Sequence, residues 1–150
     1  TKAVENISFD IKAGETVAFV GPSGSGKTTL VKLLVGLYKP IEGNILYNEK
    51  DGNSIELDEL RKQLGFVTQD NQLFAGTIRE NLVFVKPDAT EEDCLKAMNR
   101  AACQNLLARA DKGLESVIGE GGMKLSGGEK QRLSIARALL RKPKLLLLIF

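Results

Sequence analysis

The sequence predicts an α/β fold built around a parallel sheet, and three observations carry that prediction. Strand-like segments dominate the first half of the 150 residues and helix-like segments the second. A glycine-rich loop, residues 21–26, lies between a strand-like run and a helical pattern. Residues 145–149 are all apolar, as in a strand that is buried on both faces of a parallel sheet. A chain of this length is expected to form one domain with a substantial core.

The N-terminal part is expected to form a β-hairpin. Residues 6–11 alternate apolar and polar side chains, which is typical of a half-buried strand. Residues 12–15 read as a glycine-containing turn, and residues 16–20 as a second, more continuously apolar strand. After the glycine-rich loop, leucines at helical spacing predict a helix over residues 27–35, which ends at Gly36.

Three further segments of the first half have a sequence pattern that predicts their secondary structure. Residues 43–47 and residues 65–68 read as strands, and a short helix is predicted between them over residues 57–64. Beyond about residue 76 the pattern becomes mainly helical, and this change predicts a helical subdomain inserted into the sheet-containing core. The core is then expected to comprise about residues 1–75 and 140–150, and the helical subdomain about residues 76–139.

Three helix starts are predicted by capping boxes, in which a hydroxyl residue is followed three positions later by an acidic residue. They begin at Thr77, at Thr90 and at Ser126. The second box is expected to open a helical stretch that continues through Leu107. The third opens a helix that carries leucine and alanine on one face and ends at Pro143.

Composition excludes several classes of site. The net charge of +2 comes from 21 basic and 19 acidic residues, so we expect no nucleic-acid partner. Without histidine and without a CxxC pair, a zinc site is not expected. Cys94 and Cys103 are expected to be free and buried, in a reducing compartment. The sequence has no run of about 20 apolar residues, so a membrane contact would have to involve another segment or subunit.

The loop Gly21-Pro-Ser-Gly-Ser-Gly26-Lys27-Thr28 matches the phosphate-binding pattern G-x-x-x-x-G-K-[ST]. Its glycines let backbone N–H groups curl around phosphates, and the following helix points its positive dipole end at the anion. Lys27 is expected to reach the β- and γ-phosphates of ATP, and the Thr28 hydroxyl to ligate Mg²⁺. The strand-like run before the loop and the helical pattern after it favour a P-loop NTPase over a chance glycine turn. The predicted nucleotide ligands are Gly21, Ser23, Gly24, Ser25, Gly26, Lys27, Thr28 and Thr29, of which Ser23 and Thr29 could instead be simple turn or helix residues.

A second glycine motif, Leu125-Ser-Gly-Gly-Glu129, lies about a hundred residues further on. Ser126 can cap the helix, but its hydroxyl could instead meet a phosphate, which would approach the first turn freely over Gly127 and Gly128. In isolation the motif fits either an ordinary capped helix or a second anion site. If it is an anion site, Ser126, Gly127, Gly128 and Glu129 are predicted to bind nucleotide.

Together, the two motifs resemble the ABC ATPase family over essentially the whole chain. Leu125-Ser-Gly-Gly-Glu-Lys-Gln-Arg132 is similar to the family signature, with Glu129 where glutamine is commonest. Val67-Thr-Gln69-Asp70 resembles the Q-loop, which implies that Gln69 acts in catalysis by sensing Mg²⁺ and the γ-phosphate. Residues 73–82 resemble the exporter segment on which coupling helices of the membrane domain dock. Residues 116–122 resemble the exporter cross-linking loop, although Val117 and Gly121 depart from its acidic and arginine positions.

The resemblance implies partners as well as ligands. In this family two nucleotide-binding domains pair head to tail, so that ATP lies between the P-loop of one and the signature of the other. A transmembrane domain follows their closing and opening. The chain is therefore expected at the cytoplasmic face of the cell membrane, as the ATP-binding motor domain of an exporter.

The family's catalytic acids have no counterpart in this sequence. Spacing from the signature would place an Asp-Glu pair at Ile149 and Phe150, and the switch histidine and the adenine-stacking aromatic are also missing. Either the acids were substituted or the chain is clipped at both ends, and we favour clipping. The chain alone is then expected to bind ATP with little turnover. The alternatives are a soluble ABC-type ATPase of DNA maintenance and a non-hydrolysing nucleotide-binding module.

Overall fold

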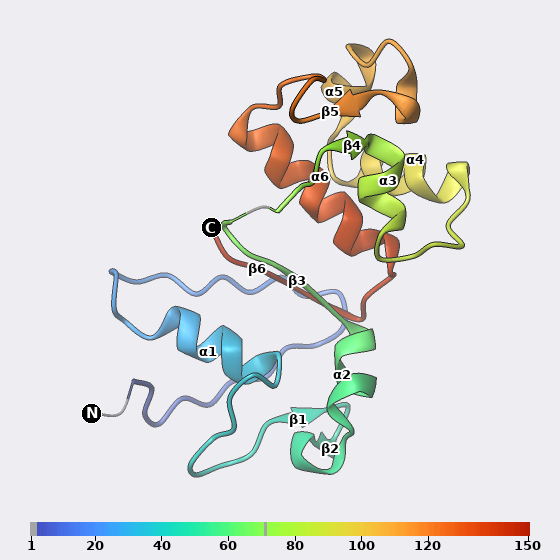
Figure 1. Cartoon of the computed structure of the whole chain (residues 1–150). Coiled ribbons are helices and arrows are strands. Elements are labelled where there is room, and N and C mark those ends of the chain that lie inside the picture. Colours follow the sequence, from blue (N-terminus) through green and yellow to red (C-terminus); the bar gives the residue numbers. More distant parts are fainter. Residues whose placement is uncertain (1–2, 71) are drawn as a thin grey trace. The chain divides into compact units, whose positions relative to one another are not determined.

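A computed structural model describes residues 3–70 and 72–150 as a mixture of helices and short strands (Figure 1). This confirms the predicted α/β class. Contacts divide the chain into two compact units, one ending at Arg61 and the other beginning at Lys62. Each unit is described separately below.

The first unit contains one glycine-preceded helix and one small hairpin. Its elements in chain order are α1 (Lys27–Leu34), β1 (Leu46–Tyr47), β2 (Lys50–Asp51), the 3₁₀ turn η1 (Gly52–Ser54) and the start of α2 (Leu57–Gln63). The helix predicted over residues 27–35 is confirmed, and Gly36 ends it with a φ of 75°. The strand predicted over residues 43–47 is reduced to its last two residues, which pair antiparallel with β2.

The N-terminal strands predicted over residues 6–11 and 16–20 are not formed in the described structure. The turn between them is present, since Glu15 N donates to Lys12 O at 3.0 Å. The rings of Phe9 and Phe19 meet edge to face at 5.2 Å, so the two segments run beside each other without a strand ladder. An isolated pair of strands is marginal without a sheet to join. The sequence therefore predicted correctly that the chain turns back on itself here, and wrongly that the two segments pair as β-strands.

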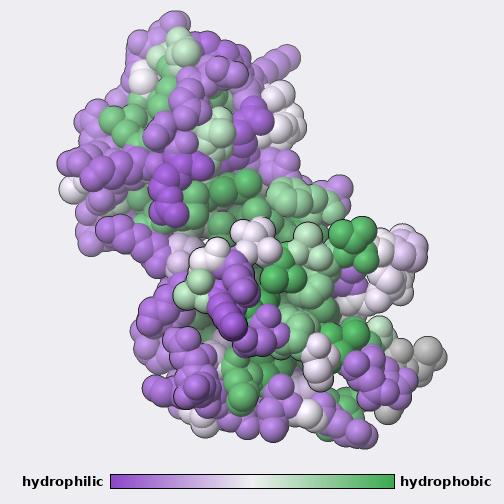
Figure 2. All heavy atoms as spheres, turned by 180° about the vertical axis from the view of Figure 1, so that it is seen from behind, coloured by the Kyte–Doolittle hydropathy of each residue, from purple (hydrophilic) through white to green (hydrophobic). Residues whose placement is uncertain are grey.

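The first unit has a thin interior. Its buried apolar side chains among residues 3–61 are Val31, Val35 and Leu60. Green apolar atoms reach the surface among hydrophilic ones in Figure 2. In this unit the large apolar side chains that are most exposed include Val20 at 93% and Ile41 at 90%. Little burial free energy therefore holds this unit together.

The second unit combines one parallel strand pair with a helical cluster. Its elements after α2 are β3 (Leu64–Val67), β4 (Gly76–Thr77), α3 (Ile78–Val83), α4 (Glu91–Arg100), α5 (Gln104–Ala108), η2 (Gly113–Glu115), β5 (Val117–Ile118), α6 (Gly127–Leu140) and β6 (Leu145–Leu148). β3 and β6 are parallel, with Leu64 opposite Leu145 and Val67 opposite Leu148 (Figure 1). This confirms the parallel pairing expected of the apolar C-terminal run, while β4 and β5 pair antiparallel.

The core of the second unit lies under α6. Leu133 and Ala136 are fully buried and Leu140 nearly so, which confirms the predicted apolar face, although Leu139 is only partly buried. Side chains of α3 and α4 pack into the same cluster, because both helices contact α6. Cys94 and Cys103 are free and buried within it, as predicted. Burial raises the pKa of the Cys103 thiol to about 11, so this cysteine stays protonated and unreactive.

All three predicted capping boxes are present, at the starts of α3, α4 and α6. The stretch expected to continue from Thr90 through Leu107 is instead broken into two helices. Ala102 has a φ of 57° between them, and Cys103 N donates to Met98 O at 2.9 Å. Such a left-handed residue with a backward bond is a typical helix C-terminus, here formed without glycine.

Candidate functional site

The predicted phosphate loop is wrapped around the start of α1. Gly24 and Gly26 have φ values of 81° and 91°, which only glycine adopts without strain. A Cβ on Gly26 would lie 2.6 Å from the backbone oxygen of Ala3, so a larger residue would also collide with the chain. A Cβ on Gly21 would lie 2.8 Å from the Ser25 hydroxyl. The glycines therefore stand where the turn requires them.

The side chain of Lys27 folds back across this loop. Its ammonium donates to Gly21 O at 2.6 Å, to Pro22 O at 2.8 Å and to Ser25 Oγ at 3.2 Å. The lysine thus holds the two arms of the loop together and keeps its positive charge inside the curve of the loop. A group of this charge at this place is suited to bind the terminal phosphates of a nucleotide.

The start of α1 is bare. Gly26 occupies the N-cap position, and among the described residues no side chain caps this helix and no acidic residue stands in its first turn. The first N–H groups of a helix have no partner within it, and with the helix dipole they attract anions. Gly21 to Ser25 and Thr28 are exposed, so an anion can approach. The loop therefore fits a phosphate chain.

Gln69 lies at the carboxyl end of the parallel strand pair in the second unit. It follows β3 by two residues, as Phe150 follows β6, and the pairing of Val67 with Leu148 places both ends at one edge. Ile149 N also donates to Val67 O at 2.9 Å. In parallel sheets this edge carries ligands. Ile149 and Phe150, which occupy the positions expected for the acidic pair, bring no carboxylate to it.

The start of α6 is a complete capping box whose first residues are exposed to solvent. Ser126 Oγ accepts from Glu129 N at 3.2 Å, and Glu129 Oε2 accepts from Ser126 N at 2.8 Å. Ser126, Gly127 and Gly128 are exposed, while the Glu129 side chain is only 12% exposed. The helix is capped and its first turn remains open to a ligand, so both roles considered for the motif are compatible with this geometry.

Arg109 binds the carboxylate of Glu129 with two nitrogens. Its Nη2 donates to Oε2 at 2.6 Å and its Nε to Oε1 at 3.1 Å. These hydrogen bonds first, and the one from the Ser126 backbone next, lower the pKa of Glu129, so the carboxylate stays ionised. The sequence did not reveal this pair, because Arg109 and Glu129 are 20 residues apart and follow no helical or strand period.

Two side chains that sequence reasoning missed hold the backbone of residues 72–77. Asn81 is fully buried; its Nδ2 donates to Phe74 O and to Thr77 O, both at 3.0 Å, and its Oδ1 accepts from Phe74 N at 3.1 Å. Arg137 of α6 donates to Gln72 O at 2.8 Å. The segment of residues 72–77 is therefore tied both to α3 and to the helix that carries the second glycine motif. A polar residue on an apolar helix face, as at Asn81, was the available signal.

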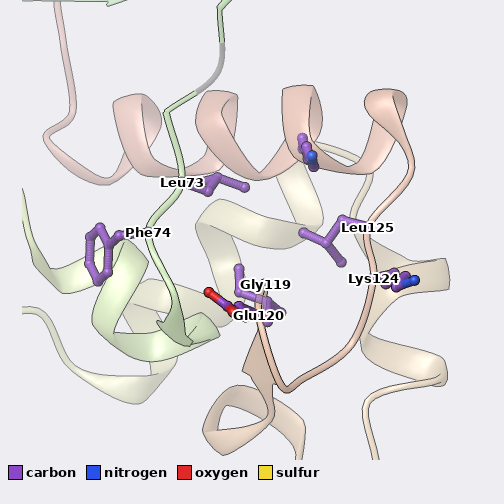
Figure 3. Close-up of a pocket in the computed structure, with 8 residues that line it drawn as sticks. Leu73, Phe74, Gly119, Glu120, Lys124 and Leu125 are labelled. Atoms are coloured by element: carbon purple, nitrogen blue, oxygen red, sulfur yellow. The ribbon is translucent and has the colours of Figure 1, made fainter.

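A pocket of about 400 Å³ lies beside this segment (Figure 3). Figure 3 shows Leu73 and Phe74 on one side and Gly119, Glu120 and Leu125 on the other. Its lining is completed by Ile118, Lys124 and Lys130. The pocket is mainly apolar with charged residues at its rim, and it includes the first two residues of the predicted docking segment.

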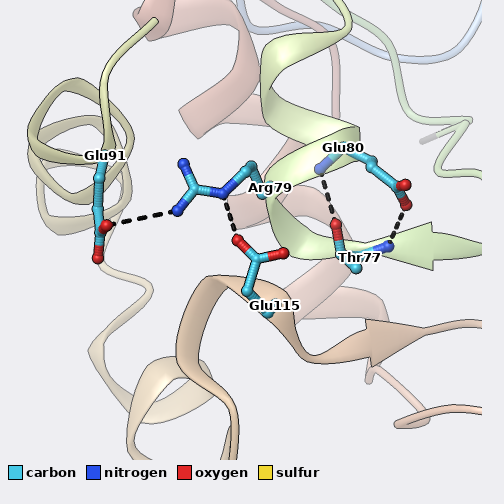
Figure 4. A network of polar contacts seen from close by, with 5 residues as sticks. All are labelled: Thr77, Arg79, Glu80, Glu91 and Glu115. Atoms are coloured by element: carbon cyan, nitrogen blue, oxygen red, sulfur yellow. Dashed lines mark hydrogen bonds and ion pairs between the residues drawn. The ribbon is translucent and has the colours of Figure 1, made fainter.

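An arginine links three elements of the same unit. Arg79 of α3 pairs with Glu115 of η2 and, at 3.5 Å, with Glu91 of α4, next to the Thr77–Glu80 capping box (Figure 4). Both carboxylates are more than half exposed. Exposed ion pairs of this kind contribute little stability, so the network is expected to add little to the stability of this unit.

The structure brings the predicted residues together in two groups. Those of the phosphate loop, Gly21 to Thr29, surround the start of α1 in the first unit. Gln69 and the residues of the second glycine motif belong to the second unit. Within residues 3–70 and 72–150 no cluster of three metal-binding side chains occurs. Over the same residues, no helix is both long and apolar enough to cross a bilayer.

Comparison with known proteins identifies the family of this chain. The family model described as ABC transporter matches residues 4–148. The uncharacterized ABC transporter ATP-binding protein YwjA of Bacillus subtilis (strain 168) is 48% identical over 97% of this chain and 25% of its own length. ABC transporter B family member 13 of Arabidopsis thaliana is 45% identical over 96% of this chain and 12% of its own length. The mitochondrial iron-sulfur clusters transporter atm1 of Aspergillus fumigatus is 45% identical over 95% of this chain and 20% of its own length. The chain thus spans at most about a quarter of these relatives.

Proposed function

The chain belongs to the ABC transporter family, in its ATP-binding domain, and from this membership we propose that it is the motor of an exporter. In this role it couples ATP binding and hydrolysis to transmembrane transport. The observation that carries the proposal is the bare, exposed start of α1 beneath a lysine-bridged glycine loop. The similarity to B family and atm1 transporters supports the exporter type.

ATP is proposed to bind with its phosphates in the loop of residues 21–29. Lys27 would leave the loop carbonyls for the β- and γ-phosphates, and backbone N–H groups of α1 would complete the cradle. Thr28 and Gln69 would hold Mg²⁺, which neutralises charge on the phosphates. Lys27 and Gln69 are the proposed catalytic residues of this chain.

A second nucleotide-binding domain is the proposed partner of the α6 start. Ser126, Gly127, Gly128 and Glu129 would face the ATP held by the P-loop of that partner, in a head-to-tail dimer. This explains why one chain carries two helix starts suited to anions, since each would serve a different ATP. The proposed division into a core, residues 1–75 and 140–150, and a helical subdomain, residues 76–139, places one motif in each part.

A transmembrane domain is the proposed second partner. The segment of residues 73–82 would receive its coupling helix, and the pocket beside Phe74 offers an apolar floor for one. Asn81 and Arg137 fix this segment to α3 and α6, so movement of the signature helix would reach the docking surface. The chain would then work at the cytoplasmic face of the membrane.

Hydrolysis is proposed to depend on a carboxylate from outside these residues. The edge beside Gln69 receives Ile149 and Phe150, neither of which can activate water. The 150 residues alone are therefore expected to bind ATP with turnover near absent.

The test uses the full-length protein and its Lys27→Ala variant. We expect the protein to sediment with membranes and its ATP turnover there to be lost in the variant. Membrane association without Lys27-dependent turnover would instead indicate a non-hydrolysing module. Recovery in the soluble fraction with ATPase activity stimulated by DNA would indicate a DNA-maintenance ATPase and overturn the transport proposal.

A further inference from the structure

The second glycine motif carries an acid at a place where a phosphate is proposed to bind. Glu129 lies in the first turn of α6, three residues after Ser126. An ionised carboxylate repels a triphosphate, and the repulsion is strongest where water is excluded, as between two closed domains. The motif therefore needs something that cancels this charge.

Arg109 meets that need by its geometry. It holds both oxygens of Glu129, at 2.6 Å and 3.1 Å, and its Nη2 also donates to Lys124 O at 3.0 Å. A guanidinium that binds a carboxylate with two parallel hydrogen bonds fixes both its charge and its direction. Because Lys124 directly precedes the motif, the same arginine fastens the backbone that leads into Ser126.

Ser126 is left in a state suited to a ligand. Its hydroxyl oxygen accepts one hydrogen bond, from Glu129 N, and its own proton can still be donated. Glu129 Oε2 accepts hydrogen bonds from Ser126 N and from Arg109 Nη2. These bonds keep the carboxylate turned toward the protein, and the Glu129 side chain is only 12% exposed. The open surface then consists of the hydroxyl and two glycines.

We propose that Arg109 is a positioning residue of the signature site, which neutralises Glu129 and holds Ser126 ready for the phosphate chain of ATP presented by a second domain. This inference rests on the proposed function. It assigns a role in nucleotide-driven pairing to a residue outside both glycine motifs. The charge of Arg109 matters only because position 129 is acidic, so removing that acid should reduce the need for the arginine.

The experiment compares variants of the full-length protein labelled for energy transfer between its nucleotide-binding domains. AMP-PNP is titrated, and the concentration that gives half-maximal domain closure is measured. We expect Arg109→Gln to raise this concentration about tenfold, as for loss of a charge-assisted hydrogen bond. Adding Glu129→Gln to Arg109→Gln should recover most of that factor. Lys112→Gln, which removes an exposed charge on a neighbouring turn, is the matched control and should leave closure unchanged.

Three results would overturn the inference. One is an Arg109→Gln variant that closes like Lys112→Gln. Another is a double variant that is no better than Arg109→Gln, since a purely structural arginine would not be relieved by removing its partner. A third is a loss of closure fully explained by a lowered melting temperature, measured on the same samples. Lys27→Ala separates the two proposals: if it leaves AMP-PNP binding intact, the proposed function fails, whatever Arg109 does.

Discussion

Two helices of this chain begin at glycine-rich sequences, but their starts are built differently. α1 begins at a left-handed glycine, and among the described residues no side chain caps it. α6 begins at Ser126 with a complete capping box, which Arg109 reinforces. A start without a side-chain cap leaves N–H groups that water or an anion can bind, whereas a capped start has partners before any ligand arrives. The comparison supports the proposal that α1 binds the nucleotide of its own domain and that α6 contacts the nucleotide of a partner domain.

The two helices also differ in how deeply their leucines are buried. Leu133 of α6 is fully buried, whereas Leu33 of α1 is half-buried. We expect Leu133→Ala to lower the free energy of unfolding by about 3–4 kcal/mol, because it leaves a cavity in the core. The matched change Leu33→Ala should cost about 1–2 kcal/mol, because less apolar surface is lost. Chemical denaturation of both variants measures the difference, and equal losses would break the comparison.

The glycine at the start of α1 gives the next largest effect. Gly26→Ala places a Cβ 2.6 Å from Ala3 O and strains a φ of 91°, and this strain alone costs about 1–2 kcal/mol. ATP affinity should fall at least about tenfold, since 1.4 kcal/mol is a factor of ten. Gly24→Ala, which also strains a left-handed φ, of 81°, is the control for the clash alone, because among the described residues no atom lies within 4 Å of its Cβ position. Calorimetric titration should show the smaller loss for Gly24→Ala, and the reverse order would refute the fit of loop to phosphate.

The caps give the smallest effect. Ser126→Ala should destabilise the protein by about 1 kcal/mol through loss of the box at α6. Thr90→Ala removes an equivalent box at α4 and should cost about as much. The melting temperatures of the two variants should therefore fall together. We expect nucleotide-driven domain closure to be impaired in Ser126→Ala and unchanged in Thr90→Ala. Equal closure in the two variants would mean that Ser126 serves only as a cap.

Helix starts and turns could be predicted from the sequence because their chemistry is local. The boxes at Thr77, Thr90 and Ser126 each lie within four residues, and all three formed. The phosphate loop was predicted in the same way, from residues that are adjacent in the sequence.

The N-terminal strands could not be predicted in this way, because a strand depends on partners elsewhere in the chain. Residues 6–11 alternate and residues 16–20 are mostly apolar, as strands would be, but the two segments form no ladder in the described structure. The contacts of Arg109 with Glu129 and of Arg137 with Gln72 were missed for the same reason, since they join residues 20 and 65 positions apart. The motifs of the candidate site could thus be predicted from the sequence, whereas the long-range contacts that hold them in place could not.

The most direct test measures ATP binding and ATP-driven domain closure separately in the full-length protein carrying Lys27→Ala or Ser126→Ala. The account predicts that Lys27→Ala abolishes binding and therefore closure, because it removes the cation inside the phosphate loop. Ser126→Ala should bind ATP with nearly normal affinity and fail to close. Equal binding losses in both variants, or normal binding in Lys27→Ala, would contradict the distinct roles of the two helix starts.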